Sequence, residues 1–317
     1  MVKLKDILVM TQTELHQFLN NHFQAVTDDI TDCPGKFLFI KGTAPVLLVA
    51  HLDTVHKTPP HIMCESEGGN YLMSPCGIGG DDRCGVYALL QTYSTCKQKP
   101  SLLFTHDEET GGNGARAFSA WSSGCVGKSA LPQFKYIIEI DRRGKDDAVY
   151  YDCANYQFEN FISSFGFKTQ FGSFSDISII APALGIAAVN LSSGYYNEHT
   201  IGEYINVGQL NDTIQKIINL VNESVKDNIP TFEYIEDPAG MYPTLHDSIE
   251  SVGFNKEYID SLMTCYVQPQ SSIQELAFEE KYEILESCGL TYEDIDYAFD
   301  TYGEESLDYL VATLLDL

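Results

Sequence analysis

Two adjacent glutamates, Glu108 and Glu109, are the residues of this sequence best suited to chemistry. They follow the apolar run 102–104, which is typical of a buried strand, and they precede a glycine-rich turn over 110–114 that opens a helix. In an open α/β sheet, ligands bind beyond the carboxyl ends of the strands. One carboxylate there can hold a metal ion while the other moves protons. A bare glutamate pair in an acidic protein also fits a solvated loop, so the surrounding residues decide the interpretation.

A histidine and an aspartate two residues apart follow a second predicted strand. The run Val46–Ala50 leads directly to His51, and Asp53 comes next but one. Residues two apart in extended backbone face the same side, so Asp53 can accept one ring N–H of His51 and leave the other nitrogen for a metal ion. The alternative is an ordinary hydrogen-bonded pair. We interpret the nearby His56 and His61 as surface or loop histidines.

The glycines before Asp81 and Asp82 favour a metal site over a phosphate site. A glycine-rich segment lets the backbone approach a bound group closely, but the residues that follow are carboxylates and not the Lys and Ser/Thr of a phosphate-binding loop. We therefore assign Asp81 as a metal ligand. Asp82 is expected behind the ligands, and Arg83 is expected to be a charge partner for the cluster.

Two further candidates stand at strand ends later in the chain. The strand 136–140 ends at Asp141, and the strand 186–191 leads into the segment that contains His199. Separations of about 30 to 60 residues match one or two α/β units, so the candidates are expected to converge at one edge of a sheet. The full set is His51, Asp81, Glu108 with Glu109, Asp141 and His199.

The elements that must position these residues follow from periodicity. Apolar spacing predicts helices over 11–23, 86–93, 117–121 and 207–221, and short apolar runs predict strands over 36–41 and 46–50. The segment 61–74 predicts a hairpin that turns at Gly68 and Gly69, and 121–133 is expected to be a loop. Alternating strands and helices indicate an α/β fold.

Composition excludes several classes of protein. With 317 residues and 44% hydrophobic content the chain can bury a sizeable core, and its net charge of −26 disfavours nucleic acid and anionic membranes as partners. We see neither a signal peptide nor a membrane span in the sequence, so a cytoplasmic protein is expected. Nine cysteines without paired spacing predict free thiols.

The last third of the chain has a different character. A linker is predicted over 233–244, which separates a domain over 1–232 from an acidic helical domain over 245–317. The segment 249–260 recurs at 285–296, so this domain holds two internal repeats. The second copy resembles a ubiquitin-associated-type three-helix module. A packing module, intramolecular or oligomeric, and a peptide-binding module both remain open.

The order and context of the site residues closely resemble the co-catalytic zinc exopeptidases, a clan that includes peptidase T, glutamate carboxypeptidases, and leucyl and glutamyl aminopeptidases. The matching segments are HLDTV, GGDDRCG, FTHDEETGGNGA, EID and NEHTIGEYI, and the resemblance covers about 37–221. It implies a three-layer α/β fold with a doubly wound, mostly parallel sheet, here followed by the small all-α C-terminal domain.

The resemblance also implies a role for each site residue. Two divalent ions, zinc first and cobalt or manganese as alternatives, would share a bridging hydroxide. His51 and Asp141 would hold one ion, Glu109 and His199 the other, and Asp81 both; Glu108 would be the general base, with Asp53 and Glu203 in support. The lid or dimerisation insertion of the relatives is missing. Tyr195 or Tyr196 is expected to replace a substrate-contacting residue of that lid, and Arg142 is a separate candidate to bind a substrate carboxylate. The plainer alternatives are structural tyrosines and a surface salt bridge.

The sequence thus predicts a metal-dependent hydrolase that cleaves a terminal peptide bond of small peptides, an aminopeptidase more than a carboxypeptidase. Two alternatives remain: an N-acyl amino acid deacylase, and a non-catalytic peptide-binding protein on the same fold. The protein is expected to be a monomer, or a homo-oligomer formed through the C-terminal helical domain.

Overall fold

The computed structural model describes residues 2–236 except Ser173, and, further on, residues 281, 282, 285, 290, 292–303 and 305–314. The chain divides into two compact units, Met1–Glu236 and Asp237–Leu317. Each unit is described by itself. The candidate site residues all lie in the first.

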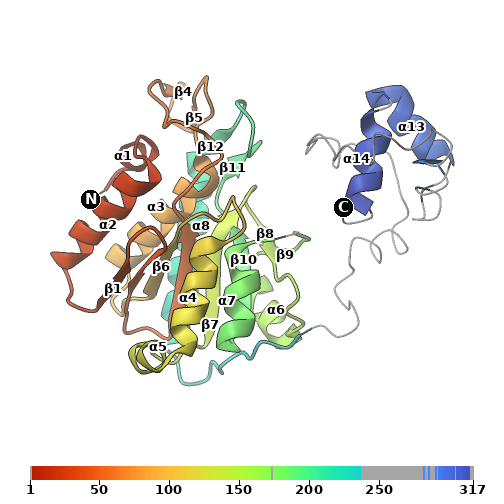
Figure 1. The fold of residues 1–317 in the computed structure, drawn as a ribbon. Helices are drawn as coiled ribbons and strands as arrows, with labels where there is room; N and C mark the ends of the chain where they lie inside the picture. Colours follow the sequence, from red (N-terminus) through yellow and green to blue (C-terminus); the bar gives the residue numbers. More distant parts are fainter. Residues whose placement is uncertain are drawn as a thin grey trace. The chain divides into compact units, whose positions relative to one another are not determined.

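An eight-stranded mixed sheet forms the centre of the first unit, in the order β1-β2-β6-β3-β7-β10-β8-β9 (Figure 1). The strands are β1 Ile30–Cys33, β2 Phe37–Ile40, β3 Val46–His51, β6 Ser101–Thr105, β7 Tyr136–Arg142, β8 Asp147–Val149, β9 Lys168–Thr169 and β10 Ala188–Ser192. The four central strands β6, β3, β7 and β10 run parallel, and antiparallel pairings flank them. Every residue of β3 and β6 is buried, as expected for parallel strands covered on both faces.

Helices cover both faces of this sheet and complete three layers. Helices α4 (Asn113–Ser123) and α7 (Asp176–Leu184) pack on one face, where Leu47 and Val49 of β3 join Phe118 and Ile180 in one apolar cluster. Helices α3 (Gly80–Thr95) and α8 (Val207–Ser224) contact each other on the opposite side, and Figure 1 shows them behind the sheet. The mixed α/β architecture with a parallel centre agrees with the predicted fold class.

The remaining elements of the first unit are short or peripheral. They are α1 Leu4–Leu8, α2 Gln12–Gln24, α5 Cys125–Ala130, α6 Tyr156–Ser163, and a four-stranded sheet of β11 Tyr195–Tyr196, β12 Tyr204–Asn206, β5 Tyr71–Met73 and β4 Cys64–Glu65. In α2, the side chain of Thr11 accepts a hydrogen bond from the backbone N–H of Glu14 and caps the helix. The predicted hairpin over 61–74 is present as the antiparallel pair β4 and β5.

One local prediction differs from the structure, and two predicted strands are arranged in a way that the sequence did not indicate. The segment 121–133 was expected to be a loop, yet it contains α5, because a short helix of small and polar residues leaves little apolar periodicity to detect. The strands 37–40 and 46–51 do not pair with each other. Strand β6 lies between them, so the two runs bracket the strand that precedes Glu108.

The described part of the second unit is helical. Helices α13 (Tyr292–Tyr302) and α14 (Glu305–Leu314) share a small apolar core with Leu285 and Leu290. The first repeat copy and residues 237–244 of the predicted linker lie outside the described residues. Residues 233 and 236 form isolated bridges with Ile186 and Cys153, so the chain is still paired with the first unit there. A separate all-α domain and its two repeats stay predictions.

None of the helices in the described part of the chain has the length and apolar character needed to cross a membrane.

Candidate metal centre

The five predicted ligand side chains lie together beyond the carboxyl ends of the parallel strands. His51 ends β3, Glu109 follows β6, Asp141 lies near the end of β7, Asp81 lies at the start of α3, and His199 lies between β11 and β12. Their donor atoms form two groups, each within 4.8 Å. The first is His51, Asp81 and Asp141; the second is Asp81, Glu109 and His199. Asp81 belongs to both groups.

The carboxylate of Asp81 presents one oxygen to each histidine. Its Oδ1 is 3.0 Å from His51 Nε2, and its Oδ2 is 3.3 Å from His199 Nε2. Asp141 Oδ1 is 3.4 Å from the same nitrogen of His51, and Glu109 Oε2 is 3.1 Å from that of His199. The two groups of donor atoms share the carboxylate of Asp81, and this arrangement suits a pair of neighbouring cations.

Glycines before Asp81 allow the backbone to come close to the small sheet. Gly79 has a φ of 67°, in the left-handed region that favours glycine. A Cβ on Gly80 would lie 2.8 Å from Cβ of Tyr195 and 2.9 Å from Cγ1 of Ile205, which leaves no room for a side chain. The Asp81–Asp82 peptide bond is cis.

Asp53 supports both halves of the cluster. Its Oδ1 lies 3.2 Å from His51 Nδ1, which leaves Nε2 facing the ligand carboxylates. Its two oxygens also accept hydrogen bonds from the backbone N–H groups of Glu108 (3.1 Å) and Glu109 (3.0 Å). The sequence pattern indicated the contact with His51. The contacts with the glutamate backbone depend on how β3 pairs with β6 and had no signal in the sequence.

Burial makes the ionised form of the clustered carboxyl groups unfavourable. Burial raises the pKa of Glu108 to about 9, with a further contribution from Asp141, and burial with the neighbouring Asp81 raises the pKa of Asp141 to about 7. Hydrogen bonds from His199 to Asp81 and Glu109 raise the pKa of this histidine to about 11. Cations at the centre of the cluster would offset this excess charge.

Three more carboxyl groups, Asp82, Glu139 and Asp176, are fully buried next to the cluster. Burial raises the pKa of all three, that of Asp176 to about 6, and Asp141 adds to the rise for Asp82 and Glu139. Asp82 accepts a hydrogen bond of 3.3 Å from the backbone N–H of His51, which agrees with its expected place behind the ligands.

The donor set suits divalent ions. Imidazole nitrogens and carboxylate oxygens are the ligands that zinc accepts in hydrolytic sites. Oε1 of Glu109 is buried and has no hydrogen-bond partner among the described residues, as expected of an oxygen that a cation would contact. The residues present therefore fit a pair of metal ions, although they do not identify the metal.

Each of the three residues expected to bind substrate contacts another side chain of the first unit. The hydroxyl of Tyr195 donates to Oδ1 of Asp141 (3.1 Å), and that of Tyr196 contacts Oε1 of Gln209 (2.5 Å). Arg142 Nε lies 3.8 Å from Asp147 Oδ2. Tyr195 thus supports a candidate ligand.

Glu203 and His56 make contacts near the cluster that the sequence did not indicate. Glu203 is fully buried and accepts hydrogen bonds from the backbone N–H groups of Gly79 (2.8 Å) and Asp81 (2.9 Å). His56 lies in a loop, as expected, and is partly buried there, with Nε2 2.8 Å from Oε2 of Glu203. His61 is exposed. Glu203 is 147 residues away from His56 along the chain, so the sequence around His56 does not indicate this contact.

Comparisons with known proteins agree on the fold. No family model and no curated protein matches the sequence. Among solved structures, aminopeptidase PepT from Bacillus cereus is 14% identical with a TM-score of 0.54, over 70% of this chain and 97% of that one. A tripeptidase from Staphylococcus aureus is 14% identical (TM-score 0.53, 70% and 96% covered), and TET1 peptidase from Pyrococcus horikoshii is 15% identical (0.51, 69% and 98%). Over about 70% of its length, this chain shares the fold of these peptidases.

Proposed function

We propose that this protein is a metal-dependent aminopeptidase that removes the first residue of small peptides. The observation that carries the proposal is the Asp81 carboxylate, which faces His51 with one oxygen and His199 with the other. The fold supports it, because the similar structures include an aminopeptidase and a tripeptidase.

In this proposal the five side chains hold two zinc ions. His51 and Asp141 would bind one ion, Glu109 and His199 would bind the other, and Asp81 would bind both. Each ion would thus occupy one of the two groups of donor atoms. Bound ions would supply Lewis-acid activation of a water molecule and of the scissile carbonyl.

Glu108 is proposed as the general base. Its carboxyl group is partly buried beside the cluster, and its backbone is held by Asp53. A carboxylate there can accept a proton from the attacking water and then deliver it to the leaving amine. Burial, with a further contribution from Asp141, raises the pKa of Glu108 to about 9. Nearby positive charge would return it to the ionised form that a base requires.

A panel of dipeptides with zinc added tests the proposal. An aminopeptidase cleaves a dipeptide and its C-terminal amide but leaves an N-acetylated dipeptide intact. Cleavage of the acetylated dipeptide but not of the amide would instead indicate a carboxypeptidase, and release of acetate would indicate a deacylase. Tight zinc binding without turnover of any member would favour a peptide-binding protein and contradict the proposal.

A further inference from the structure

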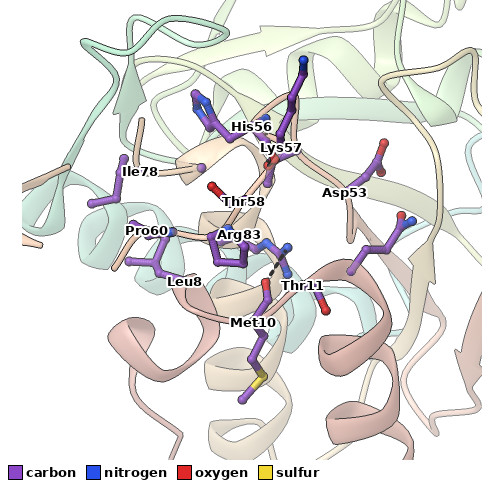
Figure 2. Close-up of a pocket in the computed structure, with 14 residues that line it drawn as sticks. Leu8, Met10, Thr11, Asp53, His56, Lys57, Thr58, Pro60, Ile78 and Arg83 are labelled. Atoms are coloured by element: carbon purple, nitrogen blue, oxygen red, sulfur yellow. Dashed lines mark hydrogen bonds between the residues drawn. The ribbon is translucent and has the colours of Figure 1, made fainter. Parts of the chain in front are cut away.

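A cavity of about 210 Å³ lies beside the metal centre, on the side of the N-terminal helices (Figure 2). Its wall is formed by the end of α1, the start of α2, the loop 53–60 and the start of α3. Asp53 lines it and also contacts His51, Glu108 and Glu109, so a ligand in the cavity would touch a residue that positions the proposed catalytic group.

Arg83 places a buried positive charge at this cavity. Its side chain lines the cavity, and the residue is only 4% exposed. Nη2 donates a hydrogen bond of 3.0 Å to the carbonyl oxygen of Met10, as Figure 2 shows, whereas Nε and Nη1 have no hydrogen-bond partner among the described residues. A guanidinium at the wall of a cavity is suited to an oxyanion such as a carboxylate, because its N–H groups donate charge-assisted hydrogen bonds.

The other charges at the wall indicate a single negative charge on the ligand. Lys57 and the first turn of α2, which begins after Thr11, add positive potential. Among the described lining residues the one acid is Asp53. Its carboxylate would repel a dianion such as phosphate more strongly than a monoanion, and it offers a counter-charge to an ammonium group.

Apolar and polar side chains share the rest of the wall. Leu8, Met10, Pro60 and Ile78 line the cavity, and so do Thr11, Gln12, Thr54 and Thr58. Apolar side chains beside one buried cation favour a small molecule that combines a carboxylate with an apolar group.

We propose that this cavity binds the carboxylate of an amino-acid-sized molecule, with Arg83 as the anchoring cation. The carboxylate has two sources: the carboxyl end of a short peptide substrate, or a free amino acid that binds as a separate ligand. The first source rests on the proposed function, whereas binding itself does not.

Binding is tested without metal and without turnover. Metal is removed with 1,10-phenanthroline and dialysis, and the protein is titrated with L-leucine, L-leucinamide and inorganic phosphate by calorimetry. We expect saturable binding of leucine, with leucinamide and phosphate each weaker by roughly tenfold or more, as loss of a charge-assisted contact implies. Equal binding of leucine and leucinamide, or no saturable binding of leucine, overturns the proposal.

Two variants and a control assign the binding to Arg83. Arg83→Gln should weaken leucine binding by roughly tenfold or more, whereas Lys128→Gln removes a positive charge from exposed α5 and should bind as the wild type does. Should Arg83→Gln not fold, Lys57→Gln in the exposed loop still tests the site, with a smaller loss expected. Wild-type affinity in both Arg83→Gln and Lys57→Gln would overturn the assignment.

The zinc-loaded enzyme separates the two sources. If the substrate carboxylate occupies the cavity, a dipeptide has a lower KM than its amide, and Arg83→Gln removes that difference. If a free amino acid occupies it, the dipeptide and its amide are cleaved alike, while added leucine changes the rate of the wild type but not that of Arg83→Gln. Failure of the proposed function would abolish turnover here yet leave leucine binding to the metal-free protein intact.

Discussion

Glu203 accepts a hydrogen bond of 2.9 Å from the backbone N–H of Asp81, although 122 residues separate them along the chain. Its other oxygen accepts from the backbone N–H of Gly79 and lies 2.8 Å from His56 Nε2. Both carboxylate oxygens are thus in use, and the residue is fully buried. These hydrogen bonds from the backbone of Gly79 and Asp81 to Glu203, which we call the Glu203 clamp, fix the backbone of Asp81 so that its carboxylate can face two histidines.

Glu203→Gln should weaken metal binding. Glutamine keeps one accepting oxygen, but its NH2 group must face an N–H donor on the other side, so one hydrogen bond becomes a repulsive contact. Loss of a partner that orients a ligand typically costs about 10- to 100-fold in metal affinity, and we expect a loss of that size in a zinc titration. Glu67→Gln, in the exposed turn before β5, is the matched control. Wild-type zinc affinity in Glu203→Gln would argue against the clamp.

Glu108→Gln should lower kcat on the order of 10² to 10⁴-fold while both metal ions stay bound. The amide keeps the size of the side chain but cannot accept a proton from water. Metal content by mass spectrometry, measured on the same sample as kcat, separates loss of the base from loss of a metal ion.

Glu109→Gln should instead lower the occupancy of one metal ion together with activity. It replaces a charged oxygen 3.1 Å from His199 with a neutral amide. If Glu109→Gln keeps both metal ions and only has a lower kcat, while Glu108→Gln loses a metal ion, the two roles are reversed. If neither change affects hydrolysis, the active site lies elsewhere.

Removal of metal should lower the melting temperature. Ions that bind only the folded protein stabilise it by RT ln(1 + [L]/Kd), about 4 kcal/mol at a thousandfold excess over Kd. In addition, the metal-free cluster keeps donor oxygens of Asp81 and Asp141 within 4.8 Å of each other, where their charges repel. Thermal unfolding is compared before chelation, after it, and after zinc is restored. An unchanged melting temperature in all three would contradict the two-metal proposal.

Acid should destabilise the first unit through His106. Burial lowers the pKa of His106 to about 4, and His16 Nδ1 lies 2.8 Å from its Nε2. In the unfolded chain a histidine titrates near ~6.5, so between about pH 6.5 and 4 the unfolded state binds a proton that the folded state does not. The contribution of His106 to the free energy of unfolding should therefore fall as pH falls through this window, whereas buried carboxyl groups with a raised pKa, such as Glu108 and Asp141, act in the opposite direction. Urea unfolding of the wild type and of a His106 variant at pH 7, 5.5 and 4.5 isolates the part that His106 contributes.

His106→Gln should reduce this pH dependence by about one bound proton, whereas His61→Gln, on an exposed loop, should leave it unchanged. The same slope in all three proteins would show that His106 does not carry the effect.

Truncation after Glu236 should leave a soluble protein with turnover of small substrates. Residues 1–236 form a compact unit, and the bridges of Glu233 with Ile186 and of Glu236 with Cys153 are retained. Truncation after Phe232, at the boundary predicted from sequence, removes both bridges and should lower the melting temperature. Aggregation of the longer product would show that the acidic C-terminal part covers apolar surface of the first unit.

Much of the fold was predictable because it is encoded locally. The apolar runs that became β3, β6 and β7 are continuous, which is how strands buried on both faces appear in sequence. The convergence of the candidate site residues was predictable for a related reason. His51 and Asp141 are polar residues at the ends of such runs, and parallel strands bring those ends to one edge of the sheet.

The sequence by itself thus determined which residues stand at the strand ends, and so which side chains can meet. The tertiary structure alone decided which groups the supporting residues contact: Glu203 accepts from the N–H of Asp81, Asp53 accepts from the N–H of Glu108, and Arg83 lies at the cavity wall. These contacts join segments 55 to 147 residues apart, as in Asp53 with Glu108 and His56 with Glu203. The spacing of apolar residues indicates only whether a segment is a helix or a strand and which side of it is buried. The residues that it contacts follow from strand order and helix packing, which no local pattern specifies.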